Sequence, residues 1–161
     1  MKELITFDNF KQKRYKRKHK MRDKRLTKKY LTDLTYQITG AAIEVHKKLG
    51  PGLLESVYHK CLMHELSLRN ISYTSECSVS VIYKGLDVDT RLRYDLYVDE
   101  VIVVELKAVD LFHPIHEAKL LTYMRLLDAP KGILINFNVV NLYRDGQKTF
   151  VNDLFRNIPE E

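Results

Sequence analysis

The spacing of apolar residues predicts two helices in the first half of the chain. From Tyr36 to Leu66, apolar side chains recur at intervals of three and four residues, which is the period of an amphipathic helix. The Gly-Pro-Gly sequence at 50–52 interrupts this pattern, so the two helices are expected to form a hairpin. The predicted boundaries are Thr32 or Asp33 and Gly50 for the first helix, and Leu53 or Leu54 and Asn70 for the second.

After residue 71 the pattern changes to one that is typical of strands. Apolar and polar residues alternate in the runs 79–83 and 92–98, and the run 101–108 is almost continuously apolar, as in a largely buried strand. Pro114 then fits the first turn of a helix that reaches Leu127. Two more strands are predicted after this helix, one buried at 132–137 and a short one near Phe150, separated by a turn at 144–147.

The resulting order of elements is α-α-β-β-β-α-β-β. Three consecutive strands followed by a crossover helix and a further strand indicate an α/β fold, with a mixed sheet flanked by helices. The length of 161 residues and the 45% of hydrophobic residues allow one domain with a real core, but not two.

Charged residues interrupt the apolar run of the 101–108 strand. Glu105 and Lys107 alternate with apolar neighbours, so they share one face of the strand, while Leu106 points to the other. A buried carboxylate or ammonium costs free energy unless it is paired or binds an ion. With Asp95 on the preceding strand, this pattern supplies the oxygen ligands and the cation of a magnesium-dependent phosphodiester hydrolase. An edge-strand salt bridge is the alternative explanation for a single Glu-x-Lys pattern.

The loop between these two strands decides whether Asp95 joins the other charges. With a two-residue loop at Asp99 and Glu100, Asp95 pairs with Val104 and lies on the wrong face. A three-residue loop or a β-bulge pairs Asp95 with Glu105 instead. We predict the odd loop or the bulge.

Four separated motifs follow one another along the chain. They are Gly52-Leu53-Leu54-Glu55-Ser56-Val57-Tyr58, Asp95, Glu105-Leu106-Lys107 and the helical segment His116–Tyr123, with the flanking sequences 42–46 and 49–52. In this order they resemble the GxxExxY family, which is similar to a branch of the PD-(D/E)XK nuclease superfamily. The resemblance covers about residues 32–152 and is specific, because four motifs occur in the right order.

This resemblance implies a restriction-endonuclease-like core, α-β-β-β-α-β, with a metal site at the diverging central hairpin. Glu55, Asp95 and Glu105 are then expected to hold Mg²⁺ or Mn²⁺, with the carbonyl of Leu106 as a further ligand. Lys107 is expected to orient or help deprotonate the attacking water. Considered by its position alone, Glu55 also fits a helix-capping role, since it follows closely on the Gly-Pro-Gly turn.

The helix after Pro114 contributes further candidates. His116, Lys119 and Tyr123 are spaced three and four residues apart and form one stripe. The related nucleases usually have glutamine where this chain has Lys119, so this lysine is expected either to contact a substrate phosphate or to pair with a site carboxylate and compete with the metal. Arg93 and Tyr123 are also candidate substrate contacts, with a structural role as the alternative for each.

Positive charge is concentrated at the start of the chain. Residues 1–29 contain 13 lysines and arginines against 3 acidic residues, a net charge of +10, whereas residues 30–161 contain 14 against 18, a net charge of −4. We expect a disordered tail at 1–29 and a single nuclease-like domain at 30–161. The tail is either an arm for nucleic-acid phosphates or a solvated extension.

These observations favour a metal-dependent nuclease acting on nucleic acid, with DNA preferred over RNA by superfamily analogy alone. The alternative is a non-catalytic nucleic-acid-binding or protein-interaction module that keeps the fold. No apolar stretch approaches the roughly 18 residues of a membrane span, and Cys61 and Cys77 suggest neither a zinc nor an iron–sulfur site. A cytoplasmic protein is expected, and a homodimer is left open.

Overall fold

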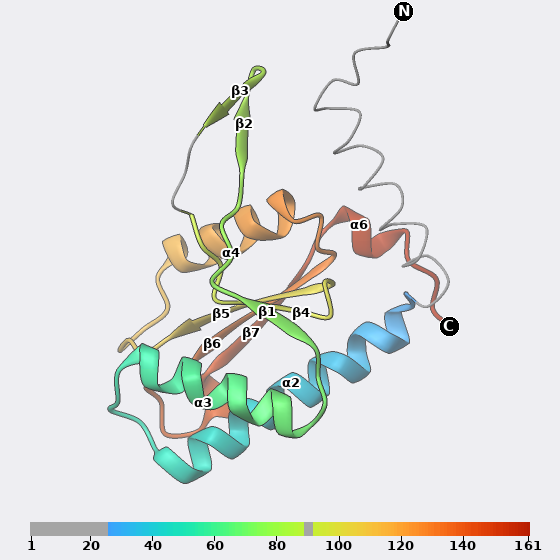
Figure 1. Ribbon diagram of the computed structural model, residues 1–161. Helices are drawn as coiled ribbons and strands as arrows, with labels where there is room; N and C mark the ends of the chain where they lie inside the picture. The colour runs from blue at the N-terminus through green and yellow to red at the C-terminus, as the bar shows by residue number, and fades with distance from the viewer. Residues whose placement is uncertain (1–25, 89–91) are drawn as a thin grey trace, which may run out of the picture.

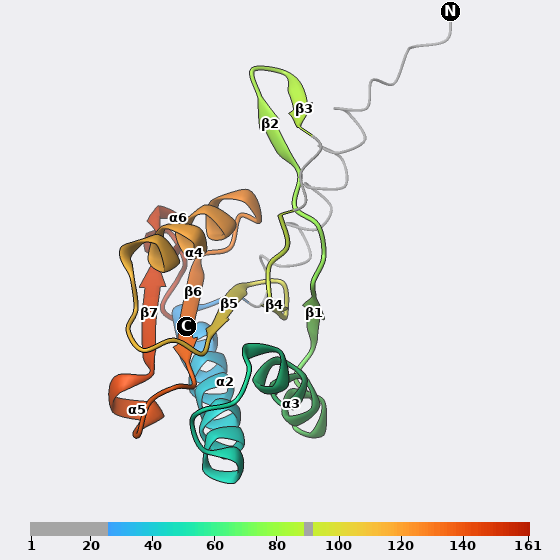
Figure 2. The ribbon, with the colours of Figure 1, turned by 90° about the vertical axis from the view of Figure 1, so that its left-hand side faces the viewer.

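A five-stranded mixed sheet lies between helices in the computed structural model, which describes residues 26–88 and 92–161 (Figure 1). The helices α2 (Lys28–Leu49) and α3 (Glu55–Leu68) cover one face, and α4 (Pro114–Leu126) covers the other (Figure 2). The predicted α/β fold class is confirmed. Within the described residues, no helix has both the length and the apolar character that crossing a membrane requires.

The start of the first predicted helix was wrong. Helix α2 begins at Lys28, and the side chain of Thr27, rather than that of Thr32 or Asp33, accepts a hydrogen bond from the amide of Tyr30 at 3.0 Å. Thr32 is helical and bonds to the carbonyl of Lys28 instead. The sequence signal was misleading because Thr32 and Asp33 are typical capping residues, whereas the true first turn has two lysines and no acidic residue. The predicted tail at 1–29 falls mainly on residues outside the described part of the chain.

The sheet has the strand order β1-β4-β5-β6-β7. The first three of these strands are antiparallel neighbours, β6 is parallel to β5 because α4 forms a crossover between them, and β7 returns antiparallel to β6. The strands are β1 (Tyr73–Ser75), β4 (Leu96–Val98), β5 (Ile102–Lys107), β6 (Lys131–Asn136) and β7 (Gln147–Val151).

One predicted strand lies outside this sheet. The residues predicted as a strand at 79–83 form β2 (Val81–Tyr83), which pairs with β3 (Leu86–Val88) in a separate hairpin that projects from the body (Figure 2). The three antiparallel strands that precede α4 in the main sheet are therefore β1, β4 and β5, and β2 is not one of them. Only Leu96–Val98 of the predicted run 92–98 is a strand, because the chain before it leads into the hairpin. The predicted turn at 144–147 is partly the short helix α5 (Leu142–Asp145), and α6 (Asp153–Arg156) follows β7.

Hydrophobic clusters occupy both faces of the sheet, and their arrangement determines where the charged residues of β5 lie. Val104 and Leu106 face α2 and α3, whereas Val103 packs in the cluster that contains Tyr123 of α4. Because side chains alternate along a strand, Glu105 and Lys107 lie with Val103 on the α4 face. Gly132 of β6 lets α4 approach closely, since a Cβ atom there would lie 2.6 Å from the sulfur of Met124.

Candidate active site

The loop between β4 and β5 has three residues, as predicted. Val98 pairs with Ile102 and Leu96 with Val104, so the same register brings Asp95 opposite Glu105. The first two loop residues, Asp99 and Glu100, have φ values of 46° and 55° and turn the chain in the left-handed region. The prediction of an odd loop is therefore confirmed.

Side chains replace the backbone ladder where β4 and β5 diverge. Beyond the Leu96–Val104 pair, the amide of Leu106 donates to Oδ2 of Asp95 at 2.7 Å, and the amide of Asp95 donates to Oε1 of Glu105 at 3.3 Å. The two carboxylates thus satisfy backbone amides that strand pairing has left open. This exchange holds both acidic side chains at the end of the hairpin.

Glu105 is the most unusual group of this site. Its side chain is completely buried, and its Oε2 atom has no hydrogen-bond partner within residues 26–88 and 92–161. The ammonium groups of Lys119 and Lys107 lie 2.9 Å and 3.9 Å from this oxygen, as ion pairs rather than aligned hydrogen bonds. Burial and the negative charge of Asp95 raise the pKa of Glu105, and the two lysines offset only part of this effect.

Lys107 connects the strand to the second helix. Its Nζ atom donates to the carbonyl of Leu106 at 2.5 Å and lies 3.7 Å from Oε2 of Glu55. Only 11% of its side chain is exposed, so the ammonium is held between these groups. Glu55, Glu105 and Lys107 are therefore brought together as the sequence suggested, although the carbonyl of Leu106 faces an ammonium in this arrangement.

The turn before α3 explains the spacing of the Gly-x-x-Glu-x-x-Tyr motif. Gly50 and Gly52 have φ values of 69° and 96°, which glycine adopts without strain. The hydroxyl of Tyr58 donates to the carbonyl of Gly50 at 2.6 Å and accepts from the amide of Leu53 at 3.1 Å. Its ring is fully buried and stacks on Phe137 with a centroid separation of 4.5 Å. Tyr58 thus fixes the turn that places Glu55 in the first turn of α3.

Helix α4 contributes Lys119 directly to the site. Its ammonium lies 5.3 Å from the ring centroid of Tyr123, and the side chain is 41% exposed. Burial alone lowers the pKa of Lys119, but the Glu105 carboxylate outweighs this effect and raises the pKa above its usual value. Tyr123 is a core residue, 2% exposed, whose hydroxyl donates to the carbonyl of Arg93 at 2.7 Å.

The remaining sequence candidates have structural roles or stay at the surface. His116 accepts from the amide of His113 in the first turn of α4, and partial burial and the nearby Lys107 charge lower the pKa of its imidazole. Arg93 is exposed and lies before β4, in an isolated bridge with Ser78. The two ion pairs that Glu105 forms among the described residues go to lysines and not to Arg93.

Three polar residues that sequence reasoning missed support the site. His59 Nε2 lies 3.1 Å from the carbonyl of Asp95, and the hydroxyl of Ser75 donates to the same carbonyl at 2.9 Å. His59 lies one helical turn after Glu55, and this spacing could have indicated that both side chains face the site. Asn136, which pairs with Lys107 in the sheet, bonds through its side chain to the backbone of Val109 at 2.7 and 3.0 Å and so fixes the chain after β5.

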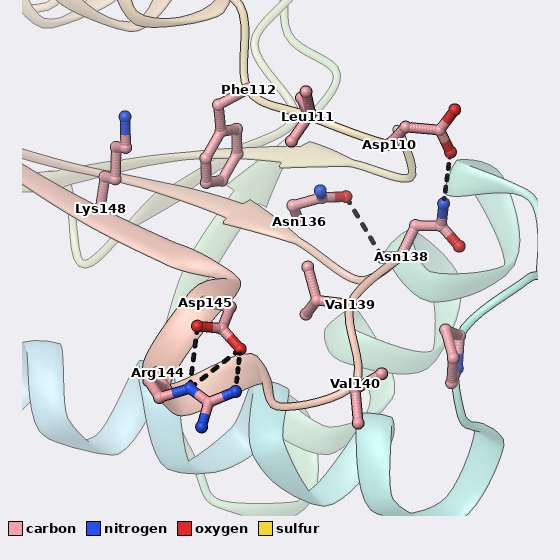
Figure 3. Close-up of a pocket in the computed structure, with 11 residues that line it drawn as sticks. Asp110, Leu111, Phe112, Asn136, Asn138, Val139, Val140, Arg144, Asp145 and Lys148 are labelled. Atoms are coloured by element: carbon pink, nitrogen blue, oxygen red, sulfur yellow. Dashed lines mark hydrogen bonds and ion pairs between the residues drawn. The ribbon is translucent and has the colours of Figure 1, made fainter.

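A cavity of about 730 Å³ opens beside these residues, beyond the ends of β5 and β6 (Figure 3). Asn136 and Phe112 line it, together with the ion pair between Arg144 and Asp145 and the hydrogen bond between Asn138 and Asp110. Positive and negative groups therefore alternate around its wall.

The donors at this hairpin suit a hard divalent cation in their chemistry. Three carboxylates and one backbone carbonyl are oxygen ligands, and Oε2 of Glu105 is a buried acceptor without a hydrogen bond. In the described part of the chain, however, no three acidic, histidine or cysteine side chains are already gathered closely enough for a metal ion. Lys107 lies between Glu55 and Glu105, and Lys119 lies beside Glu105. The residues therefore fit a divalent cation after one of these two ammonium groups has moved away.

The fold and the site define a class of protein, an α/β domain with an Asp and a Glu-x-Lys motif at a diverging hairpin. A sequence model of the PD-(D/E)XK nuclease superfamily matches residues 32–149, and the chain belongs to this superfamily. Membership supports nuclease activity on nucleic acid, and such nucleases generally use divalent metals. No curated protein and no solved structure gives a significant match.

Proposed function

We propose that this protein is a metal-dependent nuclease of the GxxExxY branch that hydrolyses phosphodiester bonds, with DNA as its substrate. The observation that carries the proposal is the Glu105 carboxylate, which is completely buried at the end of a strand and keeps one oxygen without a hydrogen bond from any described residue. A carboxylate in such a position costs free energy that a purely structural role does not repay, whereas a catalytic site needs it.

In this proposal Glu55, Asp95, Glu105 and the carbonyl of Leu106 hold Mg²⁺ or Mn²⁺. When bound, the cation would stabilise the negative charge that develops on the phosphoryl oxygens in the transition state and would lower the pKa of its bound water. Lys107 keeps its ammonium beside the carboxylates and orients the oxygen of the attacking water. The backbone amides at Asp95 and Leu106 hold the carboxylates of β4 and β5 in place during the reaction.

Cleavage assays test this proposal. Labelled linear, circular and single-stranded DNA, and RNA, are incubated with Mg²⁺ or Mn²⁺ and with chelator. We expect metal-dependent cleavage that falls by on the order of 100-fold or more in Glu105→Ala and Lys107→Ala. Lys48→Ala is the matched control, because Lys48 also pairs with a glutamate, Glu44, at 3.8 Å, but on α2 and outside the hairpin site.

The 2.9 Å ion pair between Lys119 and Glu105 favours a second candidate function, a non-catalytic nucleic-acid-binding module. This pair neutralises the buried carboxylate without a metal. If the wild-type protein and both variants bind nucleic acid but none cleaves it under any metal condition, the nuclease proposal is wrong and the binding module takes its place.

A further inference from the structure

Lys119 is the cation closest to the buried oxygen of Glu105. Its Nζ atom lies 2.9 Å from Oε2, and Lys107 lies 3.9 Å from the same atom. Both ammonium groups are therefore close to an oxygen that has no aligned hydrogen bond in the described part of the chain. Any other cation that approaches Oε2 must share this space with Lys119.

The Lys119 ammonium changes the net charge of the site. The carboxylates of Glu55, Asp95 and Glu105 carry −3 when ionised, and Lys107 and Lys119 together carry +2, which leaves the site at −1. Without the Lys119 charge the site would carry −2, and this would match a divalent cation. A like charge beside a metal site lowers its affinity for the metal.

The two lysines differ in how firmly they are held. Lys107 is 11% exposed, donates to the carbonyl of Leu106 and approaches two glutamates. Lys119 is 41% exposed, and its only ion pair in the described part of the chain is with Glu105. Its long side chain comes from α4 at the edge of the site, so the ammonium can turn toward solvent without a change in the backbone.

We propose that Lys119 is an internal counter-ion that weakens divalent-metal binding in the free protein and makes this binding depend on nucleic acid. A phosphate group at the site gives the ammonium a second partner, so it leaves Glu105 and opens the place beside Oε2. Metal and nucleic acid then bind with positive cooperativity, because each favours the same position of Lys119. This inference rests on the proposed function and assigns to it a form of regulation.

Metal binding without turnover is the first test. The full-length protein is titrated with Mn²⁺, and free Mn²⁺ is measured by electron paramagnetic resonance. We expect Lys119→Gln and Lys119→Met to bind Mn²⁺ tighter than wild type by on the order of 10- to 100-fold. Lys119→Arg, which keeps the charge, and the control Lys48→Gln on α2 should bind like wild type. Near-ultraviolet circular dichroism confirms that each variant is folded, and having two neutral variants guards against one that does not fold.

Addition of a phosphorothioate oligonucleotide, shown by gel electrophoresis to stay intact, tests the coupling. We expect it to tighten Mn²⁺ binding several-fold in wild type and to have little effect in Lys119→Gln. Equal Mn²⁺ affinity in wild type and in both neutral variants overturns the inference. An equal effect of the oligonucleotide in wild type and Lys119→Gln overturns it as well.

These outcomes are separate from a failure of the proposed function. If wild type binds Mn²⁺ through Glu105, as shown by loss of binding in Glu105→Gln, but the Lys119 variants bind equally, the nuclease proposal stands and the counter-ion inference falls. If no variant binds Mn²⁺ with or without the oligonucleotide, both fall together.

Discussion

At the residue scale, Glu105 shows how a functional group is retained against its cost in stability. Its carboxylate is buried beside Asp95, and even two lysines do not restore its usual pKa. Burial of an ion pair often contributes nothing to stability or less than nothing, because removing the charges from water costs as much as their attraction returns. The protein keeps this arrangement where a metal-dependent reaction would use it.

Replacing Glu105 with glutamine should therefore separate stability from function. We expect Glu105→Gln to have an equal or higher free energy of unfolding than wild type at pH 7 without metal, by on the order of 1 kcal/mol. A neutral amide avoids the cost of a buried ionised carboxylate, and Lys119, whose side chain is 41% exposed, can turn to solvent when it loses its partner. Since the pKa of Glu105 is raised in the folded state, the penalty is present above that folded pKa and disappears as the pH falls below the unfolded value. The difference between the two proteins should shrink in acid.

Urea unfolding at several pH values between 4 and 8 measures this difference, with chelator present throughout. Asp33→Asn is a suitable control, because Asp33 is an exposed partner of Lys29 on α2. A Glu105→Gln protein that is clearly less stable than wild type at pH 7 would show that the carboxylate is a structural group.

At the scale of elements, the turn between α2 and α3 controls the position of Glu55. Tyr58 bridges the carbonyl of Gly50 and the amide of Leu53 from inside the core. Because Glu55 begins α3 only three residues after Gly52, a shift of this turn moves its carboxylate relative to Lys107. Tyr58 is thus a positioning residue for the site.

Removal of the Tyr58 hydroxyl should loosen this turn while the ring stays in place. We expect Tyr58→Phe to lower the free energy of unfolding by about 1–2 kcal/mol, since a carbonyl and an amide that are partly buried lose their partner. Cleavage activity should fall along with it, and Tyr36→Phe, at a 79% exposed position of α2, should leave both unchanged. Thermal unfolding and initial cleavage rates measure the two effects. Unchanged activity in a destabilised Tyr58→Phe protein would mean that the turn does not position Glu55.

The elements also show what could and could not be predicted from the sequence. The strand β5 was predicted because its apolar run is local, and the period of two placed Glu105 and Lys107 on one face. The odd loop followed from the requirement that Asp95 meet Glu105. The hairpin β2–β3 was misplaced, because alternation marks a strand but does not say which strand it pairs with. The Lys119–Glu105 contact depends on how closely α4 packs on the sheet. The residue spacing alone allowed either this contact or a contact between Lys119 and a substrate phosphate.

At the scale of the whole molecule, the charge distribution bears on how nucleic acid reaches the site. Residues 30–161 carry a net charge of −4, and three of their carboxylates belong to the site. Such a domain repels a polyanion at low salt. Residues 1–25 carry 11 lysines and arginines against 3 acidic residues, so they offer the largest positive charge available to attract the substrate.

Deletion of residues 1–25 should test whether these residues attract the nucleic acid while the domain holds the metal site. The deletion leaves Thr27 to cap α2 and the amide of Lys28 to donate to the carbonyl of Pro159. We expect nucleic-acid affinity at low salt to fall on the order of 10-fold or more, with a slope of log affinity against log salt that is smaller by several units. Mn²⁺ affinity without nucleic acid should stay unchanged, since the metal ligands lie in the domain. Fluorescence anisotropy from 50 to 300 mM salt measures the slope. A shortened chain with the same affinity and slope as the full chain would place all of the nucleic-acid binding in the domain, and the exposed Lys119 would then be the first phosphate contact to test.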